Sequence, residues 1–165
     1  MSLFFFFIFF LFLENLFLPA LIGPQEFTIT PLFLIAAIAY GSDLKKSLIK
    51  ALIFLLIAEI FVGVDNGAYL IPFLVVALIY FGLNKLLSIN SNLRESNSLP
   101  GILFSSLTIL LFLYMYSLFM IFFNSSYDIP ATFSQWFELL KTSVFAMFLW
   151  SVGLTILFKY VLKQK

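Results

Sequence analysis

The run LFFFFIFFLFLENLFLP, residues 3–19, decides the class of this fold, because Glu14 is its only charged residue. A helix needs about 20 apolar residues to cross the roughly 30 Å hydrocarbon core of a membrane. With the apolar residues that follow, the run extends to residue 22 and reaches that length. Lipid offers no partner for an open strand edge, so the run predicts a membrane-spanning helix.

The rest of the chain has the same apolar character. Of its 165 residues, 63% are hydrophobic and 10% are charged, and the mean hydropathy is +1.13. Soluble domains are about half apolar and about a quarter charged. The composition therefore predicts an all-α integral membrane protein. A net charge of +1 gives no basic footprint for binding nucleic acid.

Two missing residue types exclude many kinds of chemistry. The sequence has no histidine and no cysteine. This excludes Ser–His catalysis, histidine zinc sites, disulfides and thiolate nucleophiles. The aspartates Asp43, Asp65 and Asp128 all lie beside loop signals, so the aspartate pair of a membrane aspartyl protease is missing. We expect a protein that is not an enzyme and binds no cofactor or metal.

Hydropathy predicts a single transmembrane domain, residues 1–165, that forms a six-helix bundle. The expected spans are residues 3–22, 28–40, 46–62, 68–87, 101–123 and 142–162, with an interfacial helix over residues 131–141 before the last span. The second segment is short, since 13 residues cover only about 20 Å. We expect it at the outer interface, packed against protein. If it is re-entrant instead, the N-terminus moves to the outside.

Turn-forming residues separate these segments. Pro19 follows the first apolar run. Thr30 is expected to cap the second segment, and Pro31 suits its first helical position. Gly41 is expected to end that helix, and Ser42 or Asp43 to begin the next. The strongest turn signal is the cluster after the third segment, formed by Gly63, Asp65, Asn66 and Gly67.

Basic residues set the expected orientation. With six spans and cytoplasmic termini, eight of the nine fall on the cytoplasmic side: Lys45, Lys46, Lys50, Lys85, Arg94, Lys159, Lys163 and Lys165. Only Lys141 falls outside, and Glu138 one turn earlier can offset it. The lysines near residue 45 are expected to extend to the membrane surface. A docking patch for a cytoplasmic partner is the alternative.

Glu14 and Glu59 are the candidate functional residues, because a carboxylate at membrane depth is costly unless it is paired, protonated or hydrated. Each lies about 16 Å from the cytoplasmic edge of its span, so we expect both at one level of the bundle. They are candidates for contact with a partner helix or a ligand. The structural alternatives are a hydrogen bond between Glu14 and Asn15, and capping of the turn before Gly67 by Glu59.

Hydroxyl groups run along the fifth segment. They can line a cavity, or they can bond back to the helix or across to a neighbour, which is the commoner arrangement. The residues are Ser105, Ser106, Thr108, Tyr114, Tyr116 and Ser117.

In order and spacing, residues 3–87 resemble the MreD family of rod-shape-determining membrane proteins. A polar break and Leu-Pro interrupt the first helix at residues 14–19, and a proline begins the second at residues 31–35. A glycine with charged residues follows at positions 41–46. The third helix then ends in Glu59 and a glycine turn at Gly67, before another long helix.

This resemblance implies a non-enzymatic scaffold of lateral cell-wall elongation in a bacterial cytoplasmic membrane. The implied partners are MreC-like and RodA-like membrane proteins, a transpeptidase and an MreB-like cytoplasmic filament. Folds of this family also resemble the substrate-binding subunits of vitamin transporters. A subunit of that kind is therefore the alternative function, with Glu59, Asp65, Asn66 and Tyr69 as its candidate ligand contacts.

Overall fold

The protein is helical throughout the part of the chain that the structure describes, apart from turns. A computed structural model describes residues 3–17, 29–63, 67–89, 91, 93, 98–124 and 129–161. Two of its helices continue into short π-helical segments, η1 and η2. The elements are α1 (Leu3–Phe12), η1 (Leu13–Phe17), α3 (Ile29–Tyr40), α4 (Leu44–Val62), α5 (Leu70–Leu87), α7 (Leu99–Asn124), α8 (Ile129–Ile156) and η2 (Leu157–Val161).

Local chemistry explains where these helices begin and end. Asp43 caps α4, because its side chain accepts a hydrogen bond from the backbone N–H of Lys46 at 3.2 Å. Gly63 ends α4 in the left-handed conformation, with φ of 74°, which a glycine adopts at little cost. The expected boundaries at Gly41, Asp43 and Gly63 are confirmed. First-turn prolines, which need no N–H acceptor there, are Pro31, Pro72, Pro100 and Pro130.

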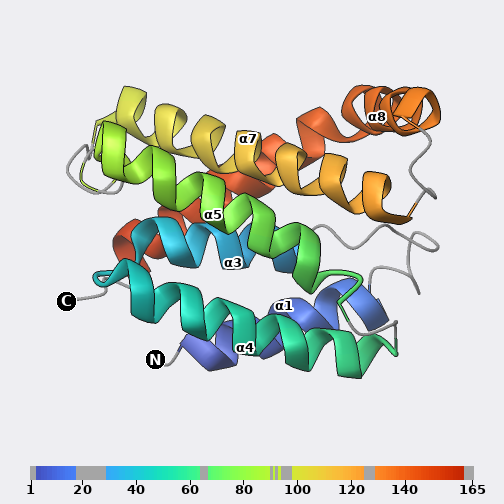
Figure 1. The fold of residues 1–165 in the computed structure, drawn as a ribbon. Helices are drawn as coiled ribbons and strands as arrows, with labels where there is room; N and C mark the ends of the chain where they lie inside the picture. The colour runs from blue at the N-terminus through green and yellow to red at the C-terminus, as the bar shows by residue number, and fades with distance from the viewer. Residues whose placement is uncertain are drawn as a thin grey trace.

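Successive helices run in opposite directions, from left to right and then from right to left in Figure 1, so each is roughly antiparallel to the next along the chain. As a result, α1 begins and η2 ends at the same end of the bundle. We call this the lysine end, because Lys45 and Lys46 lie there at the start of α4 and Lys85 at the end of α5. The opposite end holds the start of α3 and the start of α5.

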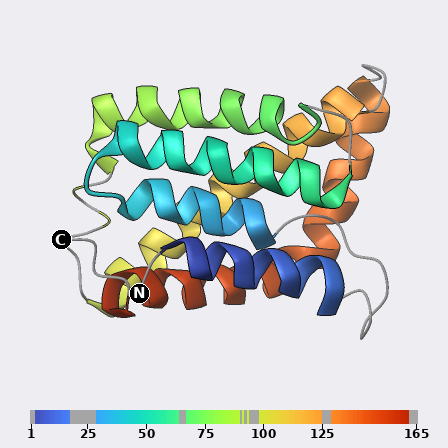
Figure 2. The same cartoon turned by 90° about the horizontal axis from the view of Figure 1, so that it is seen from below.

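Helix α3 forms the centre of the bundle (Figure 2). All twelve of its residues are buried, and it contacts α1, α4, α7 and α8. Phe33 is fully buried between Phe10 of α1 and Phe158 of η2, with ring centroids 5.1 and 5.5 Å apart. The expectation that this short helix packs against protein is therefore confirmed.

Three helices are long and apolar enough to cross a membrane. They are Leu70–Leu87, Leu99–Phe123 and Lys141–Val161, which coincide closely with the last three expected spans. Helix α4 has 19 residues but carries three lysines and Glu59. Helix α3 has only 12 residues, about 18 Å of helix. Among the described helices, three of the six expected spans thus meet both the length and the composition of a membrane crossing.

Helix α8 changes direction between its two halves. Figure 2 shows its first part crossing the end of the bundle and its second part lying beside α1. Phe10 and Trp150 mark that second contact, with ring centroids 6.3 Å apart. The expected interfacial helix over residues 131–141 and the first part of the expected span over residues 142–162 form one continuous helix here, Ile129–Ile156, of which the part from Lys141 onward belongs to a candidate membrane span.

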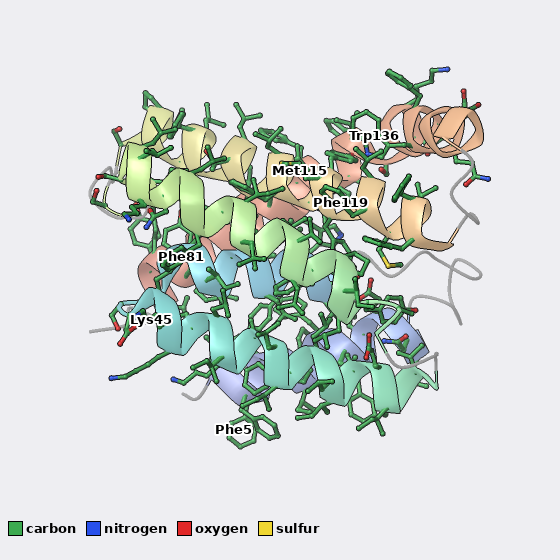
Figure 3. The ribbon with its side chains drawn as sticks, in the orientation of Figure 1. Phe5, Lys45, Phe81, Met115, Phe119 and Trp136 are labelled. Carbon is green, nitrogen blue, oxygen red and sulfur yellow. The ribbon has the colours of Figure 1, made fainter. Side chains whose placement is uncertain are left out.

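The outer surface of the bundle is strongly apolar. Phe5 is 66% exposed and projects away from the bundle in Figure 3. Leu78 on α5 and Phe145 on α8 are 69% and 73% exposed. A soluble protein rarely exposes so many large apolar side chains, and this surface suits contact with lipid.

Hydrogen bonds join α7 to α8. The hydroxyls of Ser106 and Thr155 are 3.1 Å apart, and those of Tyr114 and Ser143 are 3.2 Å apart. The Trp136 indole N–H donates to the backbone carbonyl of Tyr114 at 2.9 Å. Other α7 hydroxyls bond back to their own helix: Ser105, Thr108 and Ser117. The Ser106 hydroxyl also lies 2.8 Å from the backbone carbonyl of Ile102.

Replacing Phe33 with alanine should lower the free energy of unfolding by about 2 kcal/mol, because the truncation leaves a cavity in the core. The free energy of transferring the side chain out of the core adds little here, because lipid is as apolar as the core. Phe5→Ala is the matched control, because Phe5 is largely exposed. Unfolding in detergent measures both, and equal stability of the two variants would contradict the central position of α3.

The hydroxyl pair of Ser106 and Thr155 should show energetic coupling. A double-mutant cycle with Ser106→Ala and Thr155→Val should give about 0.6 kcal/mol, the average for hydrogen bonds between membrane helices. A cycle with Thr108→Ala and Thr155→Val should give none, because Thr108 bonds to its own helix. Additive effects in the first cycle would argue against the contact.

Candidate functional site: two buried carboxylates

Glu14 caps the start of α3 from a different helix. Its side chain lies in η1 and is only 4% exposed. One carboxylate oxygen accepts the backbone N–H of Ile29 and the other that of Thr30, both at 2.7 Å. The first N–H groups of a helix have no acceptor within the helix. Glu14 supplies it here and ties η1 to α3.

Glu59 performs the same task at the start of α5. It is 1% exposed, and one of its oxygens accepts the backbone N–H groups of Tyr69 and Leu70 at 2.8 and 2.7 Å. Its other oxygen accepts the N–H of Gly67 at 3.0 Å. The backbone carbonyl of Glu59 also accepts the N–H of Gly63, which closes α4. This single residue therefore ends one helix and holds the start of the next.

Electrostatics favours a carboxylate at each position. The aligned peptide dipoles of a helix place about half a positive charge at its N-terminus. Hydrogen bonds from N–H groups to an ionised oxygen are shorter and stronger than neutral ones, in keeping with the 2.7 Å distances at Ile29, Thr30 and Leu70. Each carboxylate thus obtains donors and a favourable dipole at a site where no lysine or arginine is needed.

The two carboxylates lie at the same end of the bundle. Helices α3 and α5 are both antiparallel to α4, so their N-termini meet at the end opposite the lysine end (Figure 1). Tyr69 lies at this end as well, since its backbone N–H bonds to Glu59 at 2.8 Å.

The other predicted site residues have different surroundings. The Asn15 side chain donates to the backbone carbonyl of Leu11 at 2.9 Å. Gly67 adopts a φ of 94°, as a turn glycine should. Lys159 is buried in η2, whereas the lysines at positions 45, 46, 50 and 85 are exposed. Six predicted residues lie outside the described residues: Pro19, Asp65, Asn66, Arg94, Lys163 and Lys165.

Sequence reasoning assigned the cap of α3 to the wrong residue. Thr30 lies inside the helix, and its hydroxyl has no hydrogen-bond partner among the described residues. Glu14 supplies the acceptor instead, from 15 residues earlier in the chain. The available signal was an isolated carboxylate before a proline-containing helix start. The alternative in which Glu59 caps its turn agrees with its bond to Gly67. A role of either glutamate in partner or ligand contact stays a prediction.

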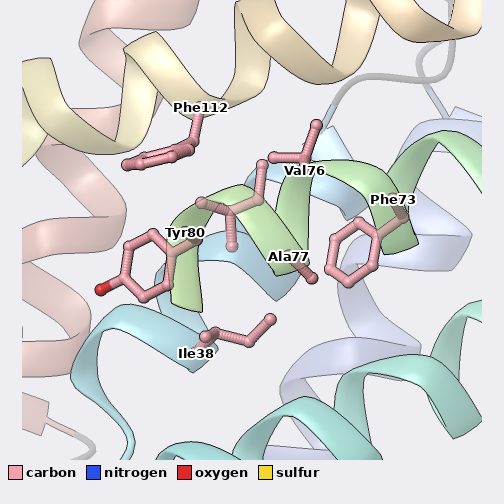
Figure 4. Close-up of a pocket in the computed structure, with 7 residues that line it drawn as sticks. Ile38, Phe73, Val76, Ala77, Tyr80 and Phe112 are labelled. Carbon is pink, nitrogen blue, oxygen red and sulfur yellow. The ribbon is translucent and has the colours of Figure 1, made fainter. Parts of the chain in front are cut away.

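A small apolar cavity lies between α3, α5 and α7 (Figure 4). Its lining includes Ile38, Phe73, Ala77, Tyr80 and Phe112. It leaves about 10 Å³ for the centre of a water molecule, the lower limit for holding one water, which also needs polar partners. This cavity is too small and too apolar for a vitamin-sized ligand.

No family model matches the chain, and no curated protein or solved structure is significantly similar to it.

Glu14→Gln and Glu59→Gln should each lower the free energy of unfolding by about 2 kcal/mol, the cost of leaving a buried donor without an acceptor. Glutamine keeps the shape but turns an amide NH₂ toward backbone N–H groups that need an oxygen. Unfolding in detergent, followed by circular dichroism, measures the effect.

Glu138→Gln is the matched control for these variants. Its carboxylate is exposed and pairs with Lys141 at 2.7 Å, and an exposed pair of this kind contributes less than about 0.5 kcal/mol. If all three variants unfold alike, Glu14 and Glu59 do not cap the helices.

Proposed function

We propose that this chain is a non-enzymatic membrane scaffold of the MreD type, which works in lateral cell-wall elongation. The observation that carries the proposal is the use of both buried carboxylates inside the bundle. Glu14 and Glu59 bond to five backbone N–H groups of their own chain. The most polar residues of the spans thus hold helices together, as a scaffold requires.

The region that resembles the MreD family is also the region whose helices are linked by the hydrogen bonds of Glu14 and Glu59. Residues 3–87 contain both glutamates, the first-turn proline Pro31 and the turn glycine Gly67. The resemblance therefore rests on residues that have structural tasks here: one carboxylate links the first two helices, and the other links the next two.

The proposed membrane topology has six spans with both termini in the cytoplasm of a bacterium. Lys45, Lys46 and Lys85 all belong to the end that also holds the start of α1. Basic residues gather on the cytoplasmic side of membrane proteins, which places the lysine end there.

The partners we propose are MreC-like and RodA-like membrane proteins and a transpeptidase, with an MreB-like filament at the lysine end. The exposed apolar side chains of α5 and α8, such as Leu78 and Phe145, offer surface for partner helices as well as for lipid. Small residues and packing drive such contacts in membranes, because lipid is as apolar as a helix surface.

A pull-down of the tagged full chain from native membranes in mild detergent tests this function. Mass spectrometry should identify MreC-like or RodA-like proteins, and depletion of the chain should turn rod-shaped cells round. A tagged membrane protein of similar span count serves as the control for non-specific recovery. Recovery of an ATPase module, with cell shape unchanged on depletion, would contradict the scaffold and support a transporter subunit.

A further inference from the structure

A groove lies at the lysine end, between α1, α3 and α4. Its apolar lining includes Leu3, Ala37, Ala51 and Phe54, and Ala37 and Ala51 are 4% and 2% exposed. Ser47 and Lys50 supply its polar atoms. The groove leaves about 20 Å³ for the centre of a water molecule. The groove therefore combines a hydroxyl group and a cation with an apolar lining.

The surroundings of this groove are positively charged. Lys45 and Lys46 lie on the same helix as Lys50, and all three are exposed (Figure 3 labels Lys45). Asp43 offsets one of them, since its carboxylate lies 3.5 Å from the Lys46 amine. Lys50 forms no ion pair within the part of the chain that the structure describes. A basic cluster at the membrane surface attracts anionic lipid.

Apolar side chains continue from the groove along the outside of the bundle. Phe4 is 46% exposed, and its ring centroid lies 5.9 Å from that of Phe54 in the groove lining. Ile53 is 50% exposed and follows Lys50 by three residues on α4, a spacing that places both on one helix face. A ligand bound here would place one end beside the Lys50 cation and the rest against an apolar surface. A free phosphate or an acidic peptide would have no use for that second surface.

We propose that this groove binds one anionic phospholipid. The Lys50 amine and the Ser47 hydroxyl bond to its phosphate, and Leu3 and Phe54 pack against the first carbons of its acyl chains. The chains then continue past Phe4 and Ile53 into the bilayer. This site does not depend on the scaffold function, because a membrane protein of either proposed kind can hold a structural lipid.

Native mass spectrometry of the purified full chain tests the proposal. The protein is mixed with phosphatidylglycerol or phosphatidylcholine of identical acyl chains, and retained lipid is counted. We expect one phosphatidylglycerol retained in preference to phosphatidylcholine. Lys50→Gln should weaken retention about fivefold, the effect of one lysine near an anionic surface, and Lys50→Arg should restore it.

Two charge-matched controls separate this groove from general attraction. Lys85→Gln removes the same charge from the same end, but Lys85 does not line the groove, so retention should be unchanged. Lys141→Gln removes the same charge at the start of the last candidate span, and lipid retention should again be unchanged. Equal retention of the two lipids, an equal loss with Lys85→Gln, or no loss with Lys50→Gln would each overturn the proposal. Circular dichroism confirms that every variant is folded.

Discussion

The start of a helix inside an apolar bundle needs hydrogen-bond acceptors, and the rest of this structure depends on how that need is met. Each unbonded N–H group in hydrocarbon costs several kcal/mol, because no water is there to accept its proton. Helix α3 has only 12 residues and is buried along its whole length. Its first N–H groups therefore have to find acceptors within the protein, and the carboxylate of Glu14 provides two.

A second carboxylate caps α5 in the same way, and the two caps link neighbouring helices of the bundle. Glu59 binds the first turn of α5 from the end of α4, and Glu14 binds the first turn of α3 from η1. Since α3 and α5 are parallel, both sets of bonds lie at one end of the bundle. Lys45, Lys46 and Lys85 lie at the other end.

Much of the fold could be predicted from the sequence, because helix spans and turns are local. Asp43 and Gly63 mark the ends of α4 by their own chemistry, and the apolar runs gave the last three spans closely. The cap by Glu14 could not be predicted in the same way, because it joins residues 15 positions apart. Which buried carboxylate accepts hydrogen bonds from which helix N-terminus depends on how the helices pack around α3. The link from Trp136 to the carbonyl of Tyr114 was missed for the same reason.

Amide hydrogen exchange tests the central claim most directly. First-turn N–H groups exchange quickly unless something accepts their protons, so Ile29 and Thr30, with Tyr69 and Leu70, should be protected in the native chain. Glu14→Ala should speed exchange at Ile29 and Thr30 alone, and Glu59→Ala at Tyr69 and Leu70 alone. Exchange that stays unchanged in both variants, or rises equally at both helix starts, would contradict the account.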